Sequence, residues 1–109
     1  MRRRVYLAGP YSTGDVAVNV RNAMAAWHLL WDLGFDPYCP HLTHFLHLHR
    51  PLRYESWLEY DSGWLEVCEA VLRLPGKSNG ADRECGKATD LNIPVFDSIA
   101  ELTAWRDRP

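Results

Sequence analysis

Two acidic residues, Glu84 and Asp61, are the side chains of this sequence best suited to catalysis. Glu84 closes the segment Gly80-Ala81-Asp82-Arg83-Glu84, which begins a predicted helix, and Asp61 lies in the middle of another. We place Glu84 in the first helical turn, where the helix dipole stabilises an ionised carboxylate that can act as a nucleophile. Cleavage of a glycosidic bond needs one carboxylate at the anomeric carbon and a second group that moves protons.

Both carboxylates also have purely structural interpretations. An acidic residue in a first helical turn commonly does no more than complement the dipole. Asp61 is flanked by the apolar residues Trp57, Leu58, Trp64 and Leu65, which indicate a sheltered face where a carboxylate needs a partner. The alternative is an Asp61 that faces solvent beside Gly63. A catalytic pair therefore requires a fold that brings the two residues together.

The segment Gly9-Pro10-Tyr11-Ser12-Thr13-Gly14 could bind an anion. It joins a strand to a helix, and unpaired backbone N–H groups at a helix N-terminus favour phosphate. The segment lacks the lysine of a P-loop and does not match the dinucleotide fingerprint. An ordinary strand-to-helix turn would have a similar composition, so both interpretations stay open.

Four histidines, His41, His44, His47 and His49, fall in a stretch predicted to be irregular, residues 41–51. His44 and His47 are three residues apart, a spacing that a helical turn could use for a metal. No carboxylate follows in the HExxH pattern, however. We therefore expect no metal site and no cofactor, and favour loop packing or contact with a base or sugar over a His-cluster metalloprotein.

Alternating strands and helices must position these residues. The hydrophobic periodicity predicts strands over residues 5–8, 35–40, 70–74 and 94–96, and helices over residues 15–33, 54–68, 81–91 and 98–105. Ser12 with Asp15, and Ser98 with Glu101, are predicted capping boxes, and Gly34 is a predicted helix stop.

This alternation predicts one α/β domain over residues 1–109, a flavodoxin-like (Rossmann-like) three-layer sandwich with a parallel sheet of four to five strands. Right-handed crossovers place the loops that follow the strands at one edge of the sheet. Strands one and three flank the switch point where ligands bind in this strand order. The loop of residues 9–14 is therefore expected beside the loop of residues 75–84.

The composition narrows the class of protein. A net charge of −2 and a pI near 6.2 give no basic surface for a nucleic acid polymer. No apolar run is long enough to cross a membrane, and no signal peptide is visible. Three scattered cysteines suggest a reducing, cytoplasmic location. The high surface-to-volume ratio of 109 residues makes a homodimer or a higher homo-oligomer an expectation.

Residues 5–12, 61–71 and 80–84, in this order and spacing, resemble the nucleoside 2-deoxyribosyltransferase superfamily, including its small nucleotide N-hydrolase branch. The resemblance covers residues 5 to about 96. It implies that Glu84 attacks C1′ and forms a glycosyl-enzyme intermediate. It implies that Asp61 assists proton transfer or holds the sugar, and that Tyr6 is an active-site tyrosine near the nucleophile.

The same resemblance implies a set of substrate-binding residues. Gly9, Pro10, Tyr11 and Ser12 match the loop that faces sugar and phosphate, Gly80 belongs to the matching helix start, and His41 matches a histidine of the hydrolase branch. The implied substrate is a nucleoside or a nucleotide.

Ser78 bears on the choice of substrate. Six residues before the glutamate, the transferases that this chain resembles usually carry an aspartate, whereas the nucleotide hydrolases carry a serine that meets the 5′-phosphate. A hydroxyl can donate to phosphate, and a carboxylate would repel it. Together with Ser12 and Lys77, Ser78 therefore favours N-glycosidic cleavage of a (deoxy)nucleoside 5′-monophosphate. Alternatives are a base-exchanging transferase, a non-catalytic nucleotide-binding or sensing module, and a Ser78 that serves only near the helix N-cap.

Overall fold

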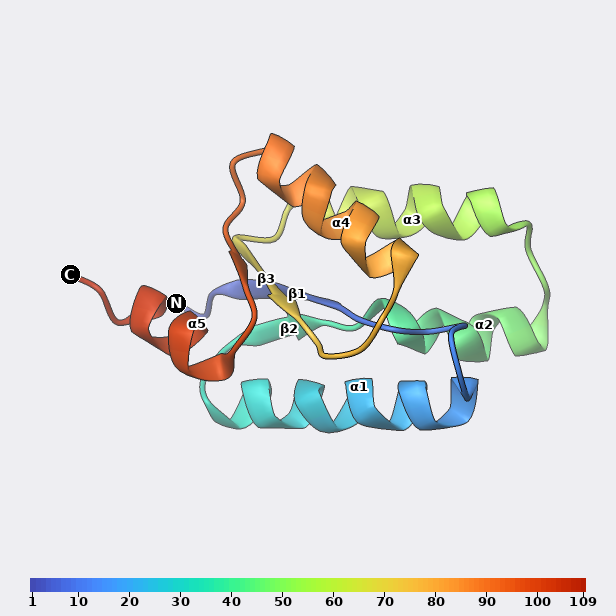
Figure 1. Cartoon of the computed structure of the whole chain (residues 1–109), viewed down its shortest axis with the longest axis horizontal. Helices are drawn as coiled ribbons and strands as arrows, with labels where there is room; N and C mark the ends of the chain where they lie inside the picture. Colours follow the sequence, from blue (N-terminus) through green and yellow to red (C-terminus); the bar gives the residue numbers. More distant parts are fainter.

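Four parallel strands in the order β2-β1-β3-β4 form the central sheet of the computed structural model, which describes residues 1–109 (Figure 1). The strands are β1 (Arg4–Ala8), β2 (Asp36–Tyr38), β3 (Ala70–Arg73) and β4 (Val95–Phe96). The helices are α1 (Val16–Asp32), α2 (Thr43–His49), α3 (Tyr54–Glu66), α4 (Asn79–Asp90) and α5 (Ile99–Arg106), with a 3-10 turn η1 (Pro40–Leu42) before α2. This is the predicted flavodoxin-like order, with four strands.

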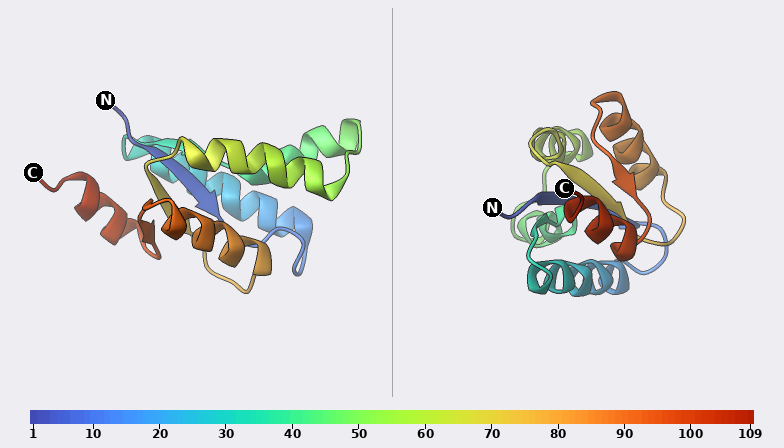
Figure 2. Two further views of the ribbon diagram at one scale, coloured as in Figure 1. Left: turned by 90° about the horizontal axis from the view of Figure 1, so that it is seen from above. Right: turned by 90° about the vertical axis from the view of Figure 1, so that its left-hand side faces the viewer.

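Helices cover both faces of the sheet, so β1 is buried on both sides (Figure 2). Val5 and Leu7 pack in a core with residues of α1 and α5. Tyr6 and Ala8 point to the other face and pack in a second core with residues of α3 and α4. A strand buried on both faces appears in the sequence as a continuous apolar run, which is why β1 was predictable.

The loops that follow β1 and β3 lie in close contact. The two strands pair in parallel, with Ala8 opposite Arg73, so their carboxyl ends are level. A Cβ atom added to Gly9 would lie 2.8 Å from Cβ of Leu74, and one added to Gly76 would lie 2.9 Å from Cγ of Pro10. Only glycine fits at both positions. The predicted juxtaposition of the two loops is therefore confirmed.

Two of the three predicted helix-end signals are confirmed. Gly34 follows α1 with a φ of 96°, and Ser98 caps α5 by accepting a hydrogen bond from the Glu101 amide at 3.1 Å. The Ser12 capping box is wrong. The carboxylate of Asp15 caps α1 by accepting from the Val18 amide, because the helix begins one residue later than predicted.

The stretch of residues 41–51, predicted as irregular, is largely helical. It contains the last two residues of η1, which begins at Pro40, and the seven-residue α2. None of the residues of α2 is buried, so the helix leaves no apolar stripe in the sequence from which periodicity could identify it. None of the helices combines the length and the apolar character needed to cross a bilayer.

Adjacent leucines of α1 test the assignment of the core. Leu30 is 0% exposed and Leu29 is 47% exposed. We expect Leu30→Ala to lower the free energy of unfolding by about 2–5 kcal/mol, because it leaves a cavity between α1 and the sheet. Leu29→Ala should change it by less than about 1 kcal/mol. Urea unfolding of both variants measures the difference, and equal losses would contradict this packing.

Candidate active site

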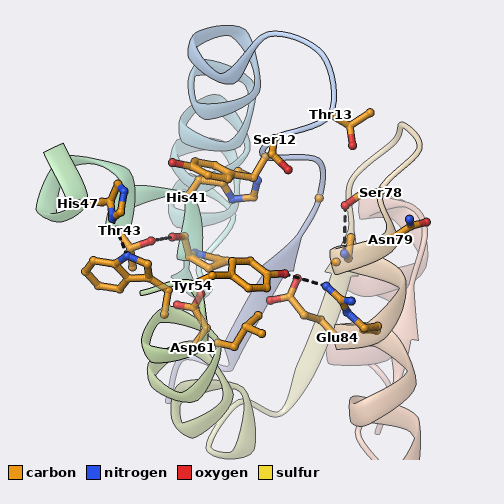
Figure 3. A pocket seen from close by; sticks show the side chains of 18 residues that line it. Ser12, Thr13, His41, Thr43, His47, Tyr54, Asp61, Ser78, Asn79 and Glu84 are labelled. Carbon is orange, nitrogen blue, oxygen red and sulfur yellow. Dashed lines mark hydrogen bonds between the residues drawn. The ribbon is translucent and has the colours of Figure 1, made fainter. Parts of the chain in front are cut away.

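A cavity of about 500 Å³ opens at the carboxyl ends of β1 and β3. Its wall consists of the loop after β1, the segment from η1 through α2, the inner face of α3 and the first turns of α4. Figure 3 shows Ser12 and Thr13 on one side, with Ser78 and Asn79 at the start of α4 on another. The cavity therefore lies at the switch point of the sheet, where α/β folds of this type bind ligands.

Glu84 extends from α4 into this cavity (Figure 3), and a tyrosine of the sheet holds it in place. The hydroxyl of Tyr6 donates a hydrogen bond to Oε2 of Glu84. Tyr6 is fully buried in β1, so its ring has no freedom to turn away from the carboxylate. The predicted proximity of Tyr6 to Glu84 is confirmed, although Tyr6 lies behind the carboxylate and does not line the cavity.

The position of Glu84 within its helix differs from the prediction. Ser78 is the N-cap of α4, so the helix begins at Asn79 and Glu84 lies in the second turn. The stabilising field of a helix dipole falls off within the first turn. Burial instead raises the pKa of Glu84 from 4.5 to about 7, with the Tyr6 hydrogen bond lowering it and the charge of Asp61 raising it. Glu84 is thus a sheltered carboxylate poised near neutral pH.

Asp61 of α3 is the second carboxylate of the cavity. Its Oδ1 accepts a hydrogen bond from the hydroxyl of Tyr38 at 3.1 Å, which supplies the partner that a sheltered carboxylate needs. Burial raises the pKa of Asp61 to about 6, and the Tyr38 hydrogen bond lowers it. The structure therefore brings Asp61 and Glu84 to one site. Sequence reasoning did not identify Tyr38, which ends the strand beside β1.

Most of the predicted substrate-binding residues line the cavity. They are Gly9, Tyr11, Ser12, His41, Ser78 and Gly80. Pro10 does not line it; its carbonyl oxygen accepts a hydrogen bond from Nε2 of His41 at 2.9 Å. Burial lowers the pKa of His41, so a neutral ring with its proton on Nε2 fits this contact. His41 thus ties the segment after β2 to the loop after β1.

The other histidines make local contacts. Nδ1 of His44 lies 2.8 Å from the hydroxyl of Tyr11. Nδ1 of His47 accepts hydrogen bonds from Nε1 of Trp57 at 2.9 Å and from the Leu52 amide at 3.3 Å. No group of three or more histidine, cysteine or acidic side chains is arranged to hold a metal ion. His47 thus packs the turn between α2 and α3, where it also lines the cavity.

Arg83 is a cavity residue that sequence reasoning missed. It is the only lysine or arginine that lines the cavity, and it makes no salt bridge. One of its guanidinium nitrogens donates to the hydroxyl of Tyr54 at 2.8 Å. Lys77 is exposed and does not line the cavity. The available signal was the position of Arg83 beside Glu84, one turn from the start of α4.

Ser78 is the N-cap of α4 and also lines the cavity. Its Oγ accepts a hydrogen bond from the Ala81 amide at 3.1 Å, as expected of an N-cap. The residue is only 7% exposed, yet it lines the cavity. An N-cap serine uses a lone pair for the helix and keeps its O–H free to donate.

Comparison with known proteins places the chain in a family. The model of a domain of unknown function, DUF7768, matches residues 3–98. No curated protein matches the sequence. Among solved structures, the chain is similar to the 2-deoxyribosyltransferase of the psychrotolerant bacterium Bacillus psychrosaccharolyticus, with a TM-score of 0.63 and 19% identity, over 84% of this chain and 69% of that one. At this identity the likeness shows a common fold.

The buried carboxylates should make stability depend on pH. Since the pKa of Glu84 is about 7 in the folded chain and 4.5 ordinarily, the folded state binds this proton more strongly, and stability falls as pH rises between these values. We expect Glu84→Gln to be more stable than the wild type at pH 8, by on the order of 2 kcal/mol, and the gain to vanish near pH 4.

Urea unfolding at pH 4, 6 and 8 measures this gain. Glu59→Gln is the matched control, because Glu59 is exposed on α3 and does not line the cavity. A gain from Glu84→Gln that is the same at all three pH values would rule out burial of an ionised Glu84 as its cause.

Proposed function

The chain belongs to the DUF7768 family, whose description names no activity, and we propose that it is an enzyme that cleaves the N-glycosidic bond of nucleoside 5′-monophosphates with Glu84 as nucleophile. One observation carries the proposal: Glu84 and Asp61 face the same cavity, and a buried tyrosine holds Glu84 in place. Two carboxylates with different partners can take different roles: one attacks the sugar, and the other moves a proton or binds a sugar hydroxyl.

In the proposed reaction, a carboxylate oxygen of Glu84 attacks C1′ of the sugar. The bond between C1′ and the base nitrogen breaks, and the base leaves with the electron pair and takes up a proton. A water molecule then attacks C1′ of the glycosyl-enzyme, which releases the sugar phosphate and regenerates the Glu84 carboxylate. Asp61 handles the proton or binds a sugar hydroxyl. Burial suits Glu84 to this chemistry, because a sheltered carboxylate is less well solvated than one in water.

Three features at the start of α4 support a 5′-phosphate on the substrate. Ser78 lines the cavity with a free O–H donor, and the first N–H groups of a helix attract anions. The guanidinium of Arg83 lies 4.0 Å from the position of a Cβ atom on Gly80 and has no carboxylate partner. The positive charge of Arg83 near the positive end of the α4 dipole is electrostatically unfavourable. An anion bound there would offset both the charge of Arg83 and the positive end of the dipole.

A base-exchanging transferase is the second candidate. The 2-deoxyribosyltransferase with the same fold favours it. Both reactions would share the glycosyl-enzyme formed on Glu84, and they differ in whether water or a second base attacks C1′. Adding a second free base to the assay distinguishes them, because only a transferase forms a new nucleotide.

The proposal extends to the assembly and location of the protein. Phe45, Leu46 and Leu48 of α2 are each more than half exposed, beside the lining residue His47. Apolar side chains gathered on one short helix are typical of a surface that another chain covers. We assign them to a homodimer contact. The three free cysteines agree with a reducing, cytoplasmic location.

Release of free base from a panel of nucleoside 5′-monophosphates tests the activity. We expect the wild type to release base and Glu84→Gln to lose at least about 10³-fold in rate, because the amide cannot form the intermediate. Chromatography of the products measures release. Glu59→Gln should keep the wild-type rate. Tight nucleotide binding without release, unchanged in Glu84→Gln, would instead establish the non-catalytic binding module.

Arg83→Met tests the preference for phosphate. We expect it to lower kcat/KM for 5′-monophosphates by about 10–100-fold, because a hydrogen bond from a charged donor to the ligand is lost. The values for the corresponding nucleosides should be unchanged. Lys77→Met is the matched control, since Lys77 is exposed and lies outside the cavity. Equal losses on nucleosides and nucleotides would contradict phosphate recognition by Arg83.

A further inference from the structure

Three aromatic rings form a continuous stack behind the two carboxylates. Tyr6 of β1 and Tyr38 of β2 are register partners on neighbouring strands, with ring centroids 5.5 Å apart and planes inclined by 27°. Trp64 of α3 stacks on the other face of Tyr38, with centroids 5.6 Å apart and planes inclined by 15°. The stack fixes the rotamers of both tyrosines, because each ring has a neighbour that limits its rotation.

Each tyrosine of the stack serves a different carboxylate. The Tyr6 hydroxyl donates to Glu84, and the Tyr38 hydroxyl donates to Oδ1 of Asp61. Tyr38 is not among the residues that line the cavity, and its hydrogen bond to Asp61 is the contact that links it to the site.

We propose that Tyr38 is a positioning residue that keeps Asp61 ionised and turned toward the cavity. A tyrosine hydroxyl that donates favours the charged form of its acceptor. The consequence for catalysis rests on the function proposed above; the effect of Tyr38 on the ionisation of Asp61 does not.

The surroundings of Asp61 make this hydrogen bond decisive. The charge of Asp61 acts on Tyr6, Tyr38, Cys39 and Glu84, none of which carries a positive charge. The basic side chains that line the same cavity are His41, His47 and Arg83; they bond to Pro10, Trp57 and Tyr54. Asp61 makes no salt bridge that would stabilise its ionised form.

Lys87 of α4 does not take over this role, because it bonds to the carbonyl oxygen of Ser62, next to Asp61, at 3.4 Å and to Glu66 at 3.0 Å. Without the Tyr38 hydroxyl, burial would keep a proton on Asp61. A neutral Asp61 would also remove the charge that raises the pKa of Glu84.

The ionised state assigns Asp61 a role. An ionised Asp61 accepts hydrogen bonds, so it suits a sugar hydroxyl better than it suits protonation of the departing base. In the proposed reaction the rate would then follow ionisation of Glu84 alone and rise with pH through about 7.

Tyr38→Phe tests the proposal, because it keeps the stacked ring and removes only the hydroxyl. Titration of the carboxyl carbons by NMR, assigned with Asp61→Asn and Glu84→Gln, follows both groups in the whole protein. We expect the midpoint of Asp61 to rise by about one unit or more and that of Glu84 to fall. Trp64→Phe, which keeps an aromatic face against Tyr38, should leave both midpoints in place.

An Asp61 midpoint that does not move in Tyr38→Phe would overturn the proposal. Where that variant does not fold, the wild-type titration decides: an Asp61 that is still protonated at pH 7 overturns the proposal as well. Neither measurement depends on activity. A wild type that releases no base therefore removes the proposed function and leaves this result standing.

Where the wild type does release base, a kinetic readout is added. We expect Tyr38→Phe to lower kcat by about ten-fold with little change in KM, and to shift the midpoint of the pH profile. A loss of kcat with an unshifted profile would show that Tyr38 is merely structural.

Discussion

A tyrosine hydroxyl in the middle of a strand that is buried on both faces must find an acceptor inside the protein, and Tyr6 finds it in Glu84. This one contact links the central strand to α4. It determines which face of α4 packs on the sheet, with Ala81 and Ala88 in the same core as Tyr6. Small side chains at these two positions let the helix approach closely enough for the carboxylate to reach the hydroxyl.

The second carboxylate repeats this arrangement on the neighbouring strand. Tyr38 occupies in β2 the position that Tyr6 occupies in β1, and each presents a hydroxyl to an acid from a covering helix. Burying two acids near each other costs stability, and the two tyrosines reduce that cost by donating to them. A protein selected for stability alone would place apolar side chains there. The acids are therefore better explained by chemistry than by packing.

Much of the fold could be predicted from the sequence because burial leaves a periodic pattern. The strands and long helices carry apolar residues at regular spacing, and the position of the cavity follows from strand order. The helix α2 could not be predicted, since it buries nothing. The predicted start of α4 was wrong by two residues, because Ser78 caps the helix earlier than its apolar residues suggest, and Glu84 therefore lies in the second turn.

The partners in the site were harder to predict than its acids. Asp61 could be identified as a sheltered carboxylate from its own neighbours in the sequence. Tyr38 could not be identified as its partner, because their contact depends on how α3 lies across β2. Arg83 was overlooked for a similar reason, since its role depends on Tyr54 and on the start of α4. Such pairings arise only from the packing of elements distant in the sequence.

The close contact between the loops after β1 and β3 also limits how this site can change during evolution. A side chain at Gly9 or Gly76 would push the two loops apart, so the inner end of the cavity cannot be reshaped by single substitutions there. The helix α2 has no such limit, because none of its residues is buried. Sequence changes that reshape the cavity within this family should therefore concentrate in α2, while the end beside Gly9 stays constant.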